Sequence, residues 1–397
     1  MRNYFLLFLI VFVDTLFLLH NVSNISIGYK EALIYFQGNS FLHYLTDFST
    51  SLFGKNDFAL RVPILAFHVF NIFLMYEVGK YFVRKEEDAL FAALIYALLP
   101  GVNSGAILIN NVTIVIFFTL LFLLLYLKGF RYVSYVVLFV TIFIDDSFLV
   151  LYLSLAFYGY FVKDRVFMIF NVLLFIVSLF IWGVEFTGKP FGYFLDIFGA
   201  YGVIFSPFLF IYFFYAMYRI LIKEKKDILW FISFTALVLS LIFSFRQKVR
   251  IEDFAAFVVI GVPLMVRVFF ASYRIRLKRF RRIHKFFFVI VFGFLVVNFL
   301  ILQCNKFLFL VYKNPSKHFA SKFYFVKELA RELKKMGVRE VICKDEKLCL
   351  RLRFYGIKKG GNYLLSEKGG DSKGAKKVSI RYINRTVKSY YVSKINI

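Results

Sequence analysis

Acidic residues and cysteines are scarce in this chain of 397 residues. It has 24 Asp and Glu against 50 Lys and Arg, and three cysteines. The cysteines match no zinc-binding spacing, and neither a Gly-x-x-x-x-Gly-Lys-Ser/Thr pattern nor a Gly-x-Gly-x-x-Gly pattern after a strand occurs. Chemistry driven by ATP or a dinucleotide therefore has no support, and we expect no cofactor and no metal site. No internal repeat of obvious period is present, which weakens the case for an inverted-repeat transporter.

Apolar residues are abundant instead. Hydrophobic residues make up 60% of the chain, 57 residues are Phe, and the mean hydropathy is +0.72. A soluble domain of this length could not bury that much apolar surface. A helix needs about 20 residues to cross roughly 30 Å of hydrocarbon, and runs of about this length recur. We predict an all-α polytopic membrane protein with about eleven spans, near 4–20, 60–82, 89–107, 112–128, 132–144, 147–162, 166–186, 207–222, 228–244, 254–272 and 286–304.

The basic residues predict an orientation in the membrane. Placing the N-terminus in the cytoplasm puts most basic short loops, including the cluster Arg274–Lys285, on the cytoplasmic side, as the positive-inside rule requires. No small-x-small cleavage signal precedes Asn21, so the first run is expected to remain as a span. An odd number of spans places the tail outside the cytoplasm. We predict a protein of the bacterial inner or plasma membrane.

The net charge of +26 is spread over short loops and the tail. This distribution favours contacts with anionic lipid headgroups over binding of nucleic acid, which we do not expect.

The composition changes near residue 313, where the apolar runs end. We therefore predict a transmembrane domain over residues 1–312, with a first extracytoplasmic loop at 21–59, and a small α/β domain over 313–397. Cys343 and Cys349 could form a disulfide if this domain faces an oxidising compartment. Its predicted elements are helices at 323–336 and 345–355, a strand at 338–343, hairpin strands at 378–383 and 387–395 with a turn at 384–386, and a low-complexity loop at 369–377.

The first loop carries the most specific pattern in the chain. After Tyr29-Lys30-Glu31-Ala32 it continues to Leu52-Phe53-Gly54-Lys55-Asn56-Asp57-Phe58-Ala59-Leu60-Arg61-Val62-Pro63. The loop resembles that of the polyprenyl-phosphate-sugar-dependent membrane glycosyltransferases, which include protein O-mannosyltransferases and aminoarabinose transferases (glycosyltransferase family 39, GT-C fold). In that family an Asp-Glu pair precedes Leu-Phe-Gly-x-x-x-Phe-Ala-x-Arg-hydrophobic-Pro.

The resemblance implies an enzyme that transfers a sugar from a polyprenyl-phosphate donor to an acceptor at the extracytoplasmic face, with inversion. A carboxylate would take the proton of the acceptor. Glu31 occupies the position of the family's Glu and is our predicted base, whereas Lys30 stands where the family has its Asp. The alternative is an ordinary solvated pair of loop residues. The donor sugar and the acceptor, whether glycan, lipid or protein, cannot be derived.

Asp145 and Asp146 lie between two short apolar runs, with no basic residue nearby in the sequence. The predicted topology puts them on the same side as Glu31. They could supply a second catalytic acid or help to bind a cation, although solvation at a helix boundary explains them equally well. The resemblance also places an Asp where this chain has Asn111, whose amide can hydrogen-bond a sugar but cannot take a proton.

Phosphate binding requires positive charge on the same side. Arg246, Lys248 and Arg250 stand at alternate positions, so an extended segment would present all three on one face. They also lie outside the membrane in the predicted topology, where the positive-inside rule disfavours such a cluster. Arg61 could contact the phosphate as well, or it could simply anchor the second span. Lys30 and Tyr193 could contact sugar or acceptor, although an aromatic helix lying on the membrane surface is the alternative reading of the region around Tyr193.

Two other functions remain open. A transporter or flippase of polyprenyl-linked glycans would need an alternating pathway across the membrane, and the first-loop motif argues against it. A non-catalytic relative that acts as a binding or assembly subunit is favoured by the departures at Lys30 and Asn111.

Overall fold

The structure is a computed structural model that describes residues 2–183, 192–311, 318, 320–367, 376–382 and 385–394. Contacts divide the chain into two compact units. Unit 1 comprises Met1–Leu16 and Ile64–Leu302, and unit 2 comprises Phe17–Pro63 and Gln303–Ile397. The first loop therefore packs in the same unit as the tail. The domain boundary at residues 312 and 313 stays a prediction.

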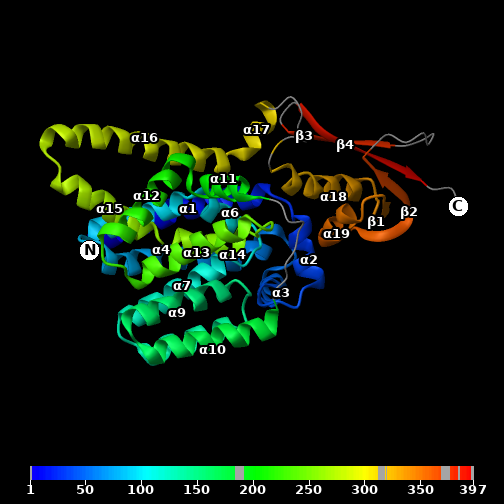
Figure 1. The fold of residues 1–397 in the computed structure, drawn as a ribbon. Coiled ribbons are helices and arrows are strands. Elements are labelled where there is room, and N and C mark those ends of the chain that lie inside the picture. The colour runs from blue at the N-terminus through cyan, green and yellow to red at the C-terminus, as the bar shows by residue number, and fades with distance from the viewer. Residues whose placement is uncertain are drawn as a thin grey trace. The chain divides into compact units, whose positions relative to one another are not determined.

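Unit 1 is helical throughout its described part (Figure 1). Three of its helices continue into unit 2, namely α1, α4 and, by its last residue, α16. Its helices are α1 (Arg2–Asn24), α4 (Asp57–Phe82), α5 (Glu86–Leu98), α6 (Pro100–Ile107), α7 (Val112–Leu127), α8 (Arg131–Thr141), α9 (Phe148–Val162), α10 (Arg165–Trp182), α11 (Phe194–Phe205), α12 (Pro207–Lys223), α13 (Ile228–Ser244), α14 (Glu252–Val259), α15 (Val262–Ile275) and α16 (Lys278–Gln303).

The described residues contain five helical stretches that are long and apolar enough to cross a membrane, namely α1, α4, α10, α14 with α15, and α16. Two bent pairs, α5 with α6 and α11 with α12, satisfy the same test when each is taken as one span. Four shorter apolar helices, α7, α8, α9 and α13, complete the set. Each of the predicted apolar segments corresponds to one of these elements, but five to seven of them, rather than about eleven, are long and apolar enough to cross a membrane. The prediction of an all-α polytopic membrane protein with a small α/β domain is confirmed.

The predicted span at 89–107 consists of two helices rather than one. α5 and α6 meet at an angle of 59°. Leu99 is extended (φ −62°, ψ 126°) and Pro100 begins the next helix, since a residue before proline avoids helical geometry. Gly101 then allows close packing, because a Cβ atom at this position would lie 2.5 Å from the side chain of Ile204.

Two contacts between polar side chains join helices of unit 1, and neither was predicted. His68 Nε2 lies 2.8 Å from Asp14 Oδ2 in a buried contact that links α4 to α1. Arg274 contacts both carboxylate oxygens of Asp88, at 2.5 and 2.6 Å, in a part-buried ion pair that links α15 to α5. Polar groups inside hydrocarbon are costly unless they are paired, so each contact specifies which helix lies beside which.

Unit 2 combines the first loop with the tail. In the described part its helices are α2 (Tyr29–Gln37), α3 (Phe41–Phe53), α17 (Asn305–Val311), α18 (Val326–Lys335) and α19 (Glu346–Phe354), with a 3₁₀ turn at Ser321–Phe323. Its strands are β1 (Glu340–Cys343), β2 (Lys358–Ser366), β3 (Lys376–Tyr382) and β4 (Arg385–Lys394). The predicted helices, first strand and hairpin strands of the tail are present. Most of the predicted loop at 369–377 and residue 384 of the turn lie outside the described residues.

The four strands form one sheet in the order β1-β2-β4-β3 (Figure 1). β1 pairs with β2 in parallel, and β4 pairs with both β2 and β3 in antiparallel fashion. β2 was not predicted, because it contains Gly360 and Gly361, which weaken a strand pattern. Both have positive φ (134° and 76°), and the register with β1 shifts here, as in a β-bulge.

In the helix α3, polar side chains are buried and large apolar side chains are exposed, the reverse of the usual arrangement. Its buried side includes Thr46 and Ser49, whereas Tyr44, Phe48 and Leu52 are exposed. The exposed residues recur at intervals of four and form one apolar stripe. An apolar face that points away from the protein core is typical of a helix at a lipid surface.

Candidate functional site

The aspartate pair lies in the turn between α8 and α9. Asp145 is buried, with 9% of its surface exposed. Its carboxylate accepts hydrogen bonds from the Asn111 side-chain amide and, at 3.0 Å, from the Ser147 backbone N–H. Burial raises the pKa of Asp145, and the neighbouring charge of Asp146 acts in the same direction. A carboxylate with a raised pKa binds a proton more strongly than an ordinary aspartate does.

Asp146 faces a cation from a distant part of the chain. Arg250 Nη2 lies 2.5 Å from Asp146 Oδ2, and Arg250 Nε lies 2.9 Å from Asp253 Oδ2. The Arg250 side chain is 67% exposed, so two carboxylates hold a guanidinium that solvent or a ligand can reach. The structure therefore brings together Asp146 and Arg250, which are 104 residues apart in the sequence. Asp253 was not predicted, because Arg250 lies before the start of α14 and no helical spacing pairs the two residues.

The basic stretch before α14 is not a strand. Residues 245–247 form a turn and residues 248–250 are irregular. Arg246, Lys248 and Arg250 are nevertheless all exposed, whereas Gln247 and Val249 are half-buried. All three cations are therefore accessible to solvent, but no strand arranges them on one face.

A cavity of 220 Å³ lies in the same unit. Its polar lining comes from Ser104, Asn110 and Glu252. Two of these residues, Asn110 and Glu252, are sequence neighbours of residues in the aspartate and arginine cluster, whose own side chains are not part of the lining. The rest of the lining is small or apolar and includes Gly101 and Gly105. An apolar cavity with few polar groups at its edge is the usual form of a small-molecule site.

The buried Oδ1 of Asn111, near Asp145, has no hydrogen-bond partner among the described residues. Buried polar groups are normally paired. This oxygen could accept a hydrogen bond from a ligand at the aspartate pair.

Glu31 and Arg61 form a buried ion pair in unit 2. Arg61 Nη2 lies 2.9 Å from Glu31 Oε2, and both side chains are 3% exposed or less. The same carboxylate oxygen accepts a hydrogen bond of 2.7 Å from the Gly28 backbone N–H, which caps α2. Arg61 also lies 3.6 Å from Asp57 Oδ1. These contacts use Glu31 and Arg61 within the protein, and both residues have a structural role.

The remaining predicted residues lie at the surface or at its edge. Lys30 is exposed on α2, next to the buried Glu31. Tyr193 is half-buried before α11, and its backbone N–H donates to the Ser244 carbonyl at 2.8 Å. A helix forms directly after Tyr193, and residues 184–191 lie outside the described residues. Because Glu31 belongs to unit 2 and the aspartates to unit 1, their convergence on one cavity stays a prediction.

Asp57 and Tyr355 complete the buried cluster around Arg61, and the sequence analysis assigned neither a role. Asp57 occupies a variable position of the first-loop motif, four residues before Arg61, and this spacing places both on one helix face. Among the residues that the structure describes, no group of three His, Cys, Asp or Glu side chains could hold a metal ion.

Comparison with known proteins finds a likeness in structure but none in sequence. No protein-family model matches this chain, and no curated protein sequence matches it. Among solved structures, the chain is similar to ArnT from Cupriavidus metallidurans bound to undecaprenyl phosphate, with 13% sequence identity and a TM-score of 0.48. The match covers 90% of this chain and 74% of that one. At this identity and TM-score, the likeness decides neither the reaction nor the ligands of this chain.

Proposed function

We propose that this protein is a membrane glycosyltransferase that moves a sugar from a polyprenyl-phosphate donor to an acceptor outside the cytoplasm. The observation that carries the proposal is the cluster of Asp145, Asp146 and Arg250 beside a cavity of the helical unit. It combines a carboxylate of raised pKa with a solvent-accessible guanidinium. The first-loop motif supports the same class of reaction.

The proposed reaction is a single displacement at the anomeric carbon. A hydroxyl or amine of the acceptor forms a bond to this carbon, and the bond to the phosphate oxygen breaks. The polyprenyl phosphate leaves with the electron pair, and a carboxylate takes the acceptor's proton. Attack opposite to the leaving group inverts the configuration. Phosphate is a good leaving group, so no second carboxylic acid is required.

Two carboxylates compete for the role of base. Glu31 is the prediction from the first loop, but its carboxylate is held in a buried ion pair with the Arg61 guanidinium. Asp145 is buried without a cation at hydrogen-bond distance among the described residues, and its pKa is raised. The ideal base has a pKa near the working pH. We therefore assign to Asp145 the role of taking the proton. Asp146 is assigned the role of holding Arg250 in position.

The phosphate of the donor is assigned to the basic stretch. Arg250 matches phosphate oxygens through its planar fork, and the exposed Arg246 and Lys248 add positive charge within four residues of it in the chain. Asn111 would hydrogen-bond the sugar through its unpaired oxygen. Lys30 and Tyr193 remain the predicted contacts of the acceptor or the sugar.

A binding or assembly subunit is the second candidate. Lys30 stands where the family has an Asp, and the only carboxylate next to it, Glu31, is sequestered by Arg61. A protein of this kind would bind the polyprenyl-linked donor without transferring the sugar.

Purified protein in lipid nanodiscs separates the two candidates. It should be incubated with a polyprenyl-phosphate donor carrying a labelled sugar and with acceptor fractions from membranes of the source cells. We expect labelled sugar to appear in one acceptor fraction. If the protein binds the donor but transfers no sugar to any fraction, the protein is a binding subunit and not an enzyme.

Replacing Arg250 by Gln is expected to weaken donor binding. A charge-assisted hydrogen bond contributes about 1.5–3 kcal/mol, so the dissociation constant should rise by roughly 10- to 100-fold. The measurement is titration of the labelled donor. Replacing Lys225, an exposed cation of the loop between α12 and α13, by Gln is the control and should leave the constant unchanged. Equal affinity of R250Q and wild type would remove Arg250 from the phosphate site.

The tail is expected to lie outside the cytoplasm. The disulfide between Cys343 and Cys349 supports this, because disulfides persist in oxidising compartments. Alkaline phosphatase fused after Ile397 should be active in intact cells, whereas green fluorescent protein at the same point, exported through the same route, should not fluoresce. The opposite pair of results would reverse the predicted orientation.

A further inference from the structure

The carboxylate of Asp57 is the centre of a polar cluster that joins the first loop to the tail. Asp57 is 3% exposed. Its Oδ1 accepts a hydrogen bond of 2.6 Å from the Tyr355 hydroxyl, and its Oδ2 lies 2.9 Å from Lys327 Nζ. Arg61 is the third partner. A buried carboxylate is stable only when paired, and here two of the three partners come from the tail.

The backbone of Ile27 is held by the same part of the tail. The Ile27 N–H donates to the Tyr355 hydroxyl oxygen at 2.9 Å, and the Ile27 carbonyl accepts from Arg351 Nε at 2.7 Å. Tyr355 thus bridges Ile27 and Asp57. The next residue, Gly28, donates its N–H to Glu31. The start of α2, which carries Lys30 and Glu31, is therefore fixed by residues at the end of α19.

Side chains along α2 and α19 extend this contact. The ring of Tyr35 meets that of Phe354 edge to face, with centroids 5.4 Å apart. The Arg353 guanidinium lies 4.6 Å from the centroid of Phe36. These aromatic and cation contacts each add a modest stabilisation, and they occur beside the Tyr355 hydrogen bonds.

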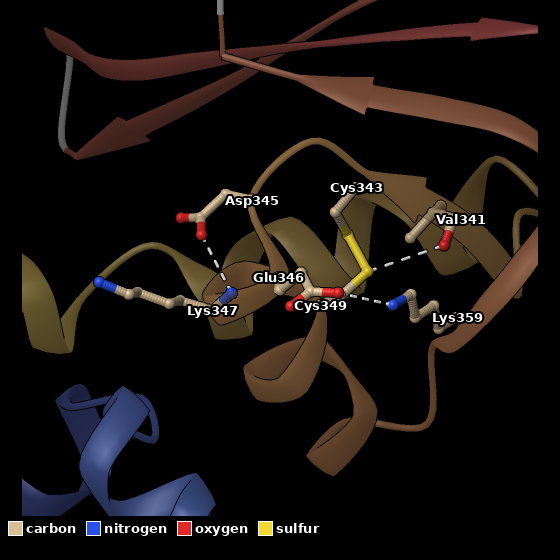
Figure 2. Close-up of a disulfide and its surroundings, with 7 residues drawn as sticks. All are labelled: Val341, Cys343, Asp345, Glu346, Lys347, Cys349 and Lys359. Atoms are coloured by element: carbon tan, nitrogen blue, oxygen red, sulfur yellow. Dashed lines mark hydrogen bonds and ion pairs between the residues drawn. A yellow bond between two sulfur atoms is a disulfide. The ribbon is translucent and has the colours of Figure 1, made fainter.

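The position of α19 is in turn fixed by a disulfide, which Figure 2 shows. Cys343 ends β1 and Cys349 lies within α19, and their Cα atoms are 5.8 Å apart. The Cys349 sulfur contacts the Val341 carbonyl of the same strand at 3.8 Å. Asp345 caps the helix by accepting from the Lys347 N–H at 3.0 Å. The strand, the cap and the disulfide together determine where α19 begins.

We propose that Asp57 and Tyr355 are positioning residues through which the tail holds the first loop, and that the Cys343–Cys349 disulfide maintains this contact by fixing α19. Two chains of contacts link the Tyr355 hydroxyl to Glu31. One passes through Asp57 and Arg61, and the other passes through the backbone of Ile27 and Gly28. The inference concerns the conformation of the loop. Only its effect on sugar transfer rests on the proposed function.

Hydrogen exchange of the full-length protein in nanodiscs tests this inference. Tyr355→Phe removes one hydroxyl, and amides of residues 27–36 should exchange about five- to tenfold faster, since one hydrogen bond is lost at each of two sites. Tyr382→Phe is the matched control. It removes the hydroxyl that donates to Glu328 at 3.1 Å within the tail, and residues 27–36 should be unaffected. Equal exchange in Tyr355→Phe and wild type would overturn the positioning role.

Reduction of the disulfide gives an independent test. A phosphine reductant should accelerate exchange of residues 27–36 in the wild type, and the Cys343→Ser/Cys349→Ser variant should show the same acceleration without reductant and no further change with it. Exchange of residues 112–127 in unit 1 should be unchanged throughout. Unaltered exchange at 27–36 after complete reduction would overturn the role of the disulfide.

Transfer assays add a functional measurement. If the wild type transfers sugar, Tyr355→Phe should lower kcat with little change in donor affinity, and Tyr382→Phe should not. If the wild type transfers nothing, the proposed function fails, while the exchange measurements still decide the positioning role.

Discussion

Replacing Asp145 by Asn is expected to lower the rate of sugar transfer by about 10²–10⁴-fold, the usual contribution of a general base. Donor binding should persist, because the amide keeps the shape and hydrogen bonding of the side chain. The measurement is single-turnover transfer of labelled sugar alongside donor titration. Wild-type activity should also fall at low pH, since a carboxylate must be ionised to take a proton. This fall should occur above the ordinary aspartate pKa of about 3.9, because burial raises the pKa of Asp145.

Glu31→Gln is the paired variant that decides between the two bases. Gln keeps a hydrogen bond to Arg61 but removes the charge of the buried pair. If Asp145 is the base, this variant should lose less transfer than Asp145→Asn and should keep the fall in activity at low pH. If Glu31→Gln lowers the transfer rate by about 10²–10⁴-fold and Asp145→Asn transfers sugar at a near-normal rate, then Glu31 is the base. Asp146→Asn should lower the pKa of Asp145 by removing a neighbouring negative charge, and thus shift the fall to lower pH.

Replacing Arg61 by Gln is expected to have the largest effect on stability. It leaves the carboxylates of Glu31 and Asp57 buried without the guanidinium that now joins them. Removal of one partner from a buried ion pair typically costs about 3–5 kcal/mol. The measurement is the unfolding temperature of unit 2 in detergent, followed by proteolysis of the tail. Arg331→Gln, at an exposed position of α18, is the control and should change stability by less than about 0.5 kcal/mol.

The double variant Glu31→Gln/Arg61→Gln tests whether the loss comes from the pair itself. Neighbours that share an ion pair are not additive, and their coupling is about 0.5–3 kcal/mol. We therefore expect the double variant to be less destabilised than the sum of the single variants. Strict additivity would show that Arg61 acts through other contacts.

The class of the protein follows from the sequence alone, because its physical cause is local. Inside a membrane, each apolar run must hydrogen-bond its backbone N–H and C=O groups within its own segment, and a single segment can do this only as a helix. The predicted segments therefore correspond to helices of the structure, even where one of them is bent. The tail was also largely predictable, because Gly337 ends α18 and alternating residues form β3 and β4. β2 escaped prediction because glycines interrupt it.

The partners of the charged residues were decided by the tertiary structure. The sequence identified Glu31, Arg61, Asp146 and Arg250 as notable, but their partners are remote in the chain. An apolar pattern specifies which face of a helix is buried, whereas an ion pair depends on which helix lies opposite and at what height. The same is true of Asp57, whose importance arises from Tyr355 and Lys327, about 300 and 270 residues away, and no local signal could specify that contact. The sequence thus determined that this is a helical membrane protein with a small α/β tail, and only the packing of distant segments decided which charges are free to act on a ligand and which hold the fold.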